Sequence, residues 1–332
     1  MSIFADTEET RSWMEYLQTL SPPSNSVALP TGEALEETLR YLEVPAEDIL
    51  DVTALAGKLE SDQSLWWVLE RAVWSLKEHM GTVTSPPRFA MLRDVNDPDY
   101  RHFYVLVFAA ALPFVREYHR GRGVPDDIAQ ATLADLGRNV RVHRKREGLG
   151  GLGVMWWLML HFRGMIYQLG RLQFERVAMG ERIAGSARDA GEDVSAATPA
   201  LSIHIPDFMG PMTPEACDDA VARARDFFST YFPEERYDFA VCHSWLLDPR
   251  LTESLRPDSN IVRFQKRFHL AGQGWDSTDG IMQFVFGKTT KEIDAVSPAT
   301  SLERAVVEHI RAGGTWWGYG GWFRLDPSAG GS

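Results

Sequence analysis

The spacing of apolar residues changes along this chain, and the change falls at a glycine-rich run. Before the run, apolar side chains recur every three to four residues, which is the spacing of one helix face. Residues 148–153 then read Gly-Leu-Gly-Gly-Leu-Gly, which is typical of a domain hinge or a closely packed turn. After the run, short segments alternate between apolar and polar residues, as strands do. We therefore expect an all-helical first domain, residues 1–147, and a mixed α/β second domain, residues 148–332.

The first part of the chain is expected to consist of helices. In residues 62–80 the apolar side chains fall on one helical face; they are Leu65, Leu69, Ala72, Val73, Leu76 and Met80. Further helices are expected after Thr31, over 103–115 and over 126–146. The segment 103–115 is the most apolar of the chain, but its 13 residues include Pro113 and are too few to span a bilayer. We expect it to be a buried helix.

The second part carries strand patterns. They lie in residues 170–177, 201–205, 237–241, 261–270 and 280–286. Between them, Thr213-Pro214-Glu215 has the order of an N-cap residue, a proline at the first helical position and an early acidic residue, which predicts a helix start. Strands interleaved with helices predict a mixed α/β domain.

Composition restricts the partners and cofactors of the chain. The 46 acidic residues exceed the 34 basic ones, and the net charge of -12 argues against nucleic acid, because phosphate binding needs a basic surface. The two cysteines, Cys217 and Cys242, cannot form a disulfide framework or a four-cysteine metal site. The first residues lack the basic start and the apolar core of a signal peptide. We expect a cytoplasmic protein that uses no metal and binds neither nucleic acid nor a membrane.

Cys242, His243 and Ser244 form the densest group of reactive side chains, directly after the apolar segment 239–241. A thiol, an imidazole and a hydroxyl can serve nucleophilic or acid–base catalysis. Neighbouring side chains of an extended chain point to opposite faces, so Cys242 and Ser244 share one face and His243 lies on the other. Two interpretations remain open. Either at least one of the three residues is catalytic, or a buried structural cysteine precedes a serine that caps the next helix.

Two further polar side chains lie on expected strands. Glu175 and His204 belong to the polar faces of segments 170–177 and 201–205. A carboxylate or an imidazole on a central strand can accept a proton from an amine, directly or through water. The alternatives are that Glu175 pairs with an adjacent arginine, Arg171 or Arg176, and that His204 has only a structural role.

Two other segments allow both a structural and a binding interpretation. Arg263, Gln265, Arg267 and His269 form one polar face of an expected strand, which is either exposed or part of a phosphate-contacting groove. Residues 316–322 alternate aromatic side chains with glycine. They either close a core as a strand with bulges or form the wall of a pocket for an acyl chain or an adenine ring.

The blocks 157–175, 201–234 and 242–268 contain the runs GRLQFE, HIP and CHSWLLDP. These blocks resemble the bacterial acyltransferase domain-containing proteins, which pair a helical N-acyltransferase N-terminal domain with a GNAT-like C-terminal domain. The resemblance covers nearly the whole chain and is strongest in its C-terminal half. It implies an α+β fold, in which an all-helical domain precedes a GNAT-like mixed α/β domain with a central, mostly antiparallel, splayed sheet.

The resemblance also implies an activity, because GNAT enzymes move an acyl group from CoA to an amine. The implied donor is acetyl-CoA or another acyl-CoA, and the acceptor is a small-molecule or peptide amine. In that fold the pantetheine arm enters between two separating strands, here 201–205 and 237–241, and the pyrophosphate lies at the start of the next helix. Residues 206–212 then form the loop that cradles the pyrophosphate. The implied CoA-binding residues are Ile203, Ile205, Met209, Gly210, Met212 and Thr213.

This loop departs from the pattern of the family, whose cradle is rich in glycine. It contains Gly210 but also Pro206 and Pro211, which have no N–H to donate to a phosphate. Acidic side chains in the first turns of the next helix are expected to repel a pyrophosphate; they are Glu215, Asp218 and Asp219.

Three functions follow from these residues. In an acyl-CoA-dependent N-acyltransferase, Glu175 or His204 removes the proton of the attacking amine, and a group within residues 242–244 protonates the leaving thiolate. In a ping-pong enzyme, Cys242 becomes acylated. In a catalytically inactive GNAT-like protein, the fold binds a metabolite or regulates. We expect the first function, and the inactive protein is the main alternative.

Overall fold

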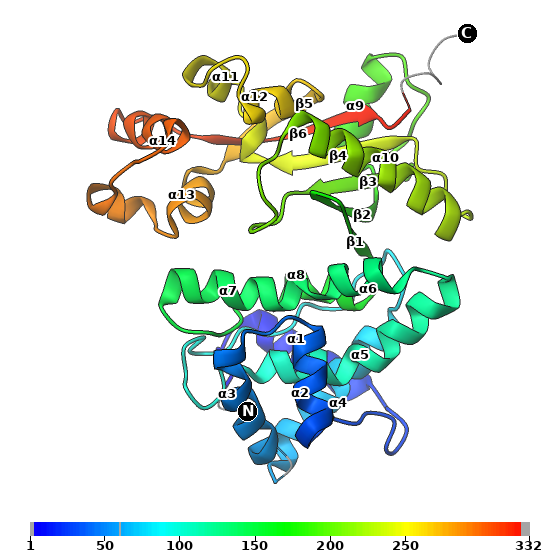
Figure 1. Ribbon diagram of the computed structural model, residues 1–332. Helices are drawn as coiled ribbons and strands as arrows, with labels where there is room; N and C mark the ends of the chain where they lie inside the picture. The colour runs from blue at the N-terminus through cyan, green and yellow to red at the C-terminus, as the bar shows by residue number, and fades with distance from the viewer. Residues whose placement is uncertain (1–2, 60, 327–332) are drawn as a thin grey trace. The chain divides into compact units, whose positions relative to one another are not determined.

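The computed structural model describes residues 3–59 and 61–326, and it divides into two compact units, Met1–Tyr167 and Gln168–Ser332. Helices make up the first unit up to residue 162, and the first strand of the sheet begins at residue 166 (Figure 1). The expected order, a helical domain followed by a mixed α/β domain, is confirmed.

Most of the expected helices of the first unit are present. Its helices are α1 (Glu8–Thr19), α2 (Gly32–Tyr41), α3 (Ala46–Leu59), α4 (Gln63–Glu78), α5 (Phe103–Arg122), α6 (Asp126–Leu133), α7 (Asp135–Glu147) and α8 (Met155–Phe162). The side chain of Asp62 caps α4 by accepting hydrogen bonds from the N–H groups of Ser64 and Leu65. The segment 126–146 differs from the prediction, because two helices, α6 and α7, meet there at Ala134. The helix predicted over 103–115 extends to Arg122, and α1, α3 and α8 were not predicted.

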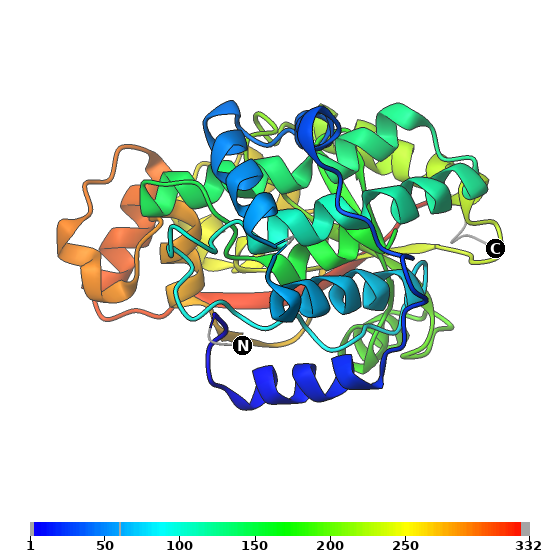
Figure 2. The same cartoon turned by 90° about the horizontal axis from the view of Figure 1, so that it is seen from below.

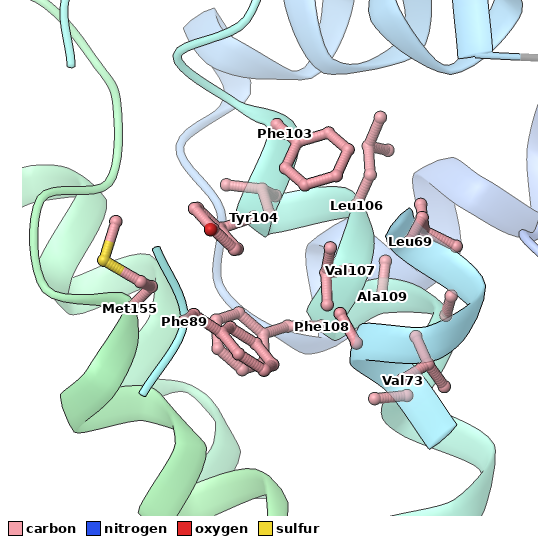
Figure 3. Packing of buried hydrophobic residues seen from close by; sticks show 14 of the residues in the cluster. Leu69, Val73, Phe89, Phe103, Tyr104, Leu106, Val107, Phe108, Ala109 and Met155 are labelled. Carbon is pink, nitrogen blue, oxygen red and sulfur yellow. The ribbon is translucent and has the colours of Figure 1, made fainter. Parts of the chain in front are cut away.

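Helix α5 forms the centre of the hydrophobic core of the first unit. Every residue from 103 to 112 is buried, as predicted for this apolar run. The ring of Phe89 stacks on Tyr104 at 5.4 Å and lies 6.0 Å from Phe108 (Figure 3). Phe108 in turn contacts Phe162 of α8, with ring centroids 4.7 Å apart. Over residues 3–59 and 61–326, no helix combines the length and apolarity needed to cross a membrane.

The glycine-rich run is a closely packed turn within the first unit. A Cβ atom at Gly150 would overlap the carboxylate of Asp48, and one at Gly151 would overlap the ring of His143. Both side chains are buried, so neither can move away easily. Helix α8 follows the run and packs on α5, α6 and α7. Residues 148–167, which the sequence analysis assigned to the second domain, therefore lie in the first unit.

The second unit is built on a six-stranded sheet with the order β1-β2-β3-β4-β6-β5. The strands are β1 (Ile166–Leu169), β2 (Leu172–Ala178), β3 (Pro199–His204), β4 (Phe239–Ser244), β5 (His269–Asp276) and β6 (Trp317–Arg324). β3 and β4 are parallel, whereas β2–β3, β4–β6 and β5–β6 are antiparallel. The aromatic and glycine-rich segment 316–322 is thus largely a sheet strand, and its partner β5 carries a bulge.

Helices connect these strands. They are α9 (Glu181–Asp189), α10 (Pro214–Tyr231), η1 (Trp245–Leu247), α11 (Arg250–Ser254), α12 (Asn260–Gln265), α13 (Thr278–Phe286), η2 (Thr290–Ala295) and α14 (Ser301–Arg311). Helix α10 starts as predicted, because the Thr213 side chain accepts a hydrogen bond from the N–H of Ala216. Helices α13 and α14 pack together at one end of the sheet in both views (Figures 1 and 2).

Two of the predicted strands were wrong. Segment 261–270 begins with α12, which Ser259 caps by accepting from the N–H of Val262, and β5 starts only at residue 269. Segment 280–286 belongs to α13, which buries Ile281 and Met282. Short apolar runs fit a helix and a strand about equally well, and the local pattern could not separate the two.

The two faces of the sheet are covered by different helices. Helix α9 packs its apolar side chains on the face that carries Ala200, Val241 and Trp322. Helix α10 belongs to the opposite face, since the guanidinium of Arg176 lies 4.5 Å above the ring of Phe232, which directly follows α10. Side chains alternate along each strand, so this assignment decides on which face each polar residue lies.

Candidate active site

Strands β3 and β4 pair only over a short distance and then separate. The ladder joins Leu201 to Ala240 and Ser202 to Val241, and it ends there within the described residues of both strands. On their other edges, β3 pairs with β2 from Pro199 to His204, and β4 pairs with β6 from Phe239 to Ser244. An interrupted ladder of this kind is what a pantetheine arm, which carries amide groups, needs in order to pair with strand backbones. The expected splayed sheet is confirmed.

Glu175 and His204 form a hydrogen-bonded pair beside this opening. The β2–β3 register sets Gln173 opposite His204 and Glu175 opposite Ser202, so all four side chains lie on the face covered by α9. Nε2 of His204 lies 2.8 Å from Oε2 of Glu175, and both side chains are partly exposed. A carboxylate bonded to an imidazole fixes the orientation of the ring.

The alternative pairing of Glu175 with a neighbouring arginine was wrong. Arg171 donates to the backbone carbonyls of Gly210 and Pro206, at 2.9 and 3.2 Å. Arg176 lies on the opposite face and pairs with Glu235 at 2.8 Å. Strand alternation separates Arg176 from Glu175, although the two residues are adjacent in sequence.

His243 lies on the same face as the Glu175–His204 pair. It follows Val241 by two residues on β4, and Val241 packs against α9. Partial desolvation of its ring lowers the pKa of His243, and the charges of His204 and Arg182 lower it further, whereas Glu175 opposes the shift. The same electrostatic influences indicate that the three polar side chains, Glu175, His204 and His243, are neighbours at the opening.

Cys242 and Ser244 lie on the other face, where the first is buried and the second caps a helix. Cys242 is buried, and this burial raises the pKa of its thiol to about 12, which keeps it protonated at neutral pH. The Ser244 hydroxyl caps η1 by accepting from the N–H of Leu246 at 3.0 Å. The run 242–244 is therefore divided between two faces, as strand alternation predicted, with the reactive imidazole apart from the thiol.

The predicted cradle loop follows β3 and is held by Arg171. Phe208 and Gly210 adopt positive φ angles of 60° and 76°, and the Arg171 guanidinium bonds the carbonyls on both sides of this bend. Of the predicted CoA-binding side chains, Ile203 and Met212 are buried, Ile205 and Met209 are half-buried, and Thr213 caps α10. The buried side chains of Ile203 and Met212 thus fix the backbone of β3 and of the loop.

Two of the three acidic residues at the start of α10 are paired with arginines. Asp218 lies 2.6 Å from Arg267, which also donates to the carbonyl of Pro214, and Asp219 lies 2.7 Å from Arg223. These contacts offset the repulsion that the acidic side chains alone would exert on a pyrophosphate. Arg267 thus lies at the cradle, although the strand face to which the sequence analysis assigned it does not exist.

Asp248 of the CHSWLLDP block and Gln265 have structural roles. Asp248 is buried and accepts a hydrogen bond from the N–H of Trp317 at 2.8 Å, which ties this block to β6. Gln265 donates to the carbonyls of Leu246 and Asp248 at 2.9 and 2.7 Å. Gln265 is therefore a buried structural residue and not part of a phosphate-contacting groove.

Sequence reasoning missed two residues near the site. Arg182 on α9 lies close enough to His243 to lower its pKa, and the ring of Trp275 lies 6.3 Å from that of His243. Trp275 stands in the run Gly-Gln-Gly-Trp-Asp, where flanking glycines were a signal for a bulge. Within the described residues, no three His, Cys, Asp or Glu side chains gather as a metal site would require.

Comparisons with known proteins agree with this geometry. Residues 33–164 match the N-acyltransferase N-terminal domain family, and residues 166–323 match the GNAT-like C-terminal domain family. The solved structure of an acyltransferase in complex with decanoyl-CoA and teicoplanin is 37% identical to this chain, with 96% of each chain covered and a TM-score of 0.87. An acyltransferase variant in complex with octanoyl-CoA and an acyltransferase in complex with CoA and 10C-teicoplanin are each 36% identical, with 96% of each chain covered and TM-scores of 0.87. A search of curated proteins found no match.

A helical domain followed by a mixed sheet that opens beside a carboxylate–imidazole pair defines a protein of the acyltransferase class. The chain belongs to the acyltransferases that combine an N-acyltransferase N-terminal domain with a GNAT-like C-terminal domain. The predicted fold and the predicted class, an acyl-CoA-dependent acyltransferase, are confirmed.

Proposed function

We propose that this chain transfers an acyl group of about octanoyl to decanoyl length from CoA to an amine of a glycopeptide. The observation that carries the proposal is the end of the β3–β4 ladder at Ser202 and Val241, directly beside the Glu175–His204 pair. The acyl length and the acceptor class are supported by the octanoyl-CoA, decanoyl-CoA and teicoplanin complexes of similar acyltransferases. Acetyl-CoA, which the sequence analysis also allowed, is a shorter donor than those complexes contain.

His204 is the proposed general base, and Glu175 orients it. The amine nitrogen attacks the thioester carbonyl, the C–S bond breaks, and the amine loses one proton. The His204 imidazole takes this proton, and Glu175 at 2.8 Å stabilises the imidazolium that forms. The lowered pKa of His243 keeps this neighbouring ring neutral near pH 7, so it adds no repulsion to the charged His204.

Ser244 is the proposed hydrogen-bond donor to the leaving thiolate. Its oxygen accepts from the N–H of Leu246, which leaves the hydroxyl proton to be donated, and a water molecule completes the protonation of the sulfur. Cys242 is unsuited to a covalent mechanism, because only a thiolate is an effective nucleophile and burial keeps this thiol neutral. Direct attack of the amine is therefore the mechanism that these residues support.

The donor binds, on this proposal, in the opening and at the cradle loop. The backbone of residues 203–205 and 242–244 pairs with the pantetheine amides. Arg171, which shapes the loop, and Arg267, at the start of α10, supply positive charge for the phosphates. The two prolines of the loop reduce the number of N–H donors. The arginines and the remaining N–H groups of the α10 N-terminus supply the attraction instead.

The test incubates the purified full chain with acetyl-, octanoyl- or decanoyl-CoA and with teicoplanin from which the acyl chain has been removed. The proposal predicts a product heavier by one octanoyl or decanoyl group and one equivalent of CoA thiol, with slower reaction from acetyl-CoA. Mass spectrometry identifies the product, and a thiol reagent follows the rate. Donor binding without any acylated product would instead support the binding or regulatory alternative, and faster acetyl transfer would overturn the assigned chain length.

A further inference from the structure

The edge strand β5 carries a bulge that directs a tryptophan toward the site. β5 advances from Ala271 to Trp275 while its partner β6 moves only from Gly320 to Gly318. Gly272 within this bulge has a φ of +69°, a conformation that side chains disfavour. Bulges of this kind change the direction of a side chain and are common beside active sites.

Glycines of β6 make the space that the Trp275 ring occupies. A Cβ atom at Gly318 would overlap the six-membered ring of Trp275, and a Cβ atom at Gly320 would lie 3.4 Å from the ring of His243. His243 and Gly320 are directly opposite each other in the β4–β6 ladder. The glycine and aromatic alternation of residues 316–322 therefore serves to hold two rings against the sheet.

The Trp275 ring is on the face of the sheet from which an acceptor must approach. Its partner Gly318 shares a face with Gly320 by strand alternation, and this is the face of His243 and of the Glu175–His204 pair. An amine that gives its proton to His204 while it attacks a thioester in the opening comes from this side. Trp275 is 38% exposed, and its ring lies 6.3 Å from that of His243.

We propose that Trp275 determines acceptor specificity by stacking on the ring that bears or adjoins the reacting amine. This inference rests on the proposed function and assigns the acceptor side of the same site. A large exposed indole offers a flat apolar surface for an aromatic ring or the apolar face of an amino sugar, both of which a glycopeptide contains. The acyl chain of the donor enters through the opening between β3 and β4 and does not need this ring.

The test measures equilibrium binding of deacylated teicoplanin by calorimetry in the presence of CoA, which requires no turnover. Trp275→Ala is expected to weaken this binding about tenfold, and Trp275→Phe is expected to restore most of it. Gly318→Ala, which displaces the ring, is expected to act like Trp275→Ala. The control is Phe284→Ala, which removes an exposed aromatic side chain from α13 and is expected to leave the affinity within about twofold.

The same variants are then compared in steady-state transfer from decanoyl-CoA. The expected result is a higher KM for the acceptor in Trp275→Ala, with the KM for decanoyl-CoA changed less than about twofold. Equal acceptor affinity in wild type and Trp275→Ala, or no binding of the glycopeptide to the wild type, would overturn the inference. Binding that depends on Trp275 without any transfer would leave the inference standing and would contradict the proposed function instead.

Discussion

A carboxylate–imidazole pair occurs in each unit of the molecule, but the two pairs have different surroundings. Asp135 and His161 in the first unit are 3.3 Å apart, and at most 3% of either side chain is exposed. Glu175 and His204 in the second unit are 2.8 Å apart, with 19% and 28% of their side chains exposed. The same chemical groups are thus sealed in a helical core in one case and reachable by a substrate in the other.

The neighbours of each carboxylate explain the difference in role. Asp135 also accepts hydrogen bonds from Arg138 and Trp157, at 3.0 and 2.9 Å, so it is held ionised by several donors. Burial alone raises the pKa of Asp135, but the facing His161 and Arg138 outweigh it, and the net shift is downward. Glu175 is paired with the imidazole of His204 at an open sheet edge. We infer that the buried pair stabilises the fold and the exposed pair exchanges protons with substrate.

The largest expected effect is a loss of activity when the exposed Glu175–His204 pair is disrupted. His204→Gln removes the proposed base, and the expected loss in kcat/KM is about 10²- to 10⁴-fold. Because the side chain is partly exposed, the thermal midpoint is expected to change little. Thiol release from decanoyl-CoA and thermal unfolding measure the two effects. The matched control is His309→Gln, a half-buried histidine of α14 that bonds a backbone carbonyl; equal activity in both variants would remove His204 from the mechanism.

The next largest expected effect is a loss of stability when the buried Asp135–His161 pair is disrupted. Asp135→Ala leaves Arg138 and His161 without their carboxylate, and the expected loss in free energy of unfolding is about 3–5 kcal/mol. Denaturant unfolding measures it. The control Asp6→Ala breaks an exposed ion pair with Arg11 and is expected to cost less than about 1 kcal/mol. Similar losses in the two variants would show that the buried pair has no special structural role.

A histidine without a carboxylate gives a third test of the comparison, through pH. His119 on α5 is buried between the rings of Tyr118 and Tyr167, and burial lowers its pKa to about 4. In the unfolded chain His119 binds a proton near pH 6.5, whereas in the folded chain it binds one only near pH 4. His119 therefore does not lower the free energy of unfolding above pH 6.5, but it lowers it by about 3 kcal/mol as the pH drops to 4. In His119→Phe this part of the pH dependence is expected to disappear; an unchanged slope would contradict the assignment.

The smallest expected effect follows the replacement of Cys242, whose thiol lies on the opposite face of the sheet from His204. Cys242→Ala is expected to retain wild-type transfer within about twofold and to lose about 1 kcal/mol of stability from the buried side chain. Mass spectrometry of the wild type after incubation with decanoyl-CoA is expected to detect no acylated enzyme. An adduct on Cys242, together with an inactive alanine variant, would require the ping-pong mechanism.

Local patterns were sufficient where one face of an element is clearly apolar or a cap is clear. They predicted α4, α5, the start of α10, and strands β2, β3 and β4. They failed in segments 261–270 and 280–286, where short apolar runs suit either period and tertiary packing selects the helix. The end of the first unit was also out of reach, because α8 packs on helices that are distant in sequence.

The candidate site was predictable residue by residue but not as an arrangement. Glu175 and His204 were each recognised as proton acceptors, yet their contact depends on the β2–β3 register, which no local pattern contains. Strand alternation correctly separated His243 from Cys242 and Ser244. Trp275 was missed because a bulge, and not the regular alternation, sets its direction.

The most direct test is a crystal structure of the full chain with decanoyl-CoA. We predict that the pantetheine arm lies between residues 203–205 of β3 and 242–244 of β4, with the thioester carbonyl on the side of the Glu175 and His204 side chains. Donor bound elsewhere on the second unit, or strands β3 and β4 hydrogen-bonded to each other through His204, would contradict it.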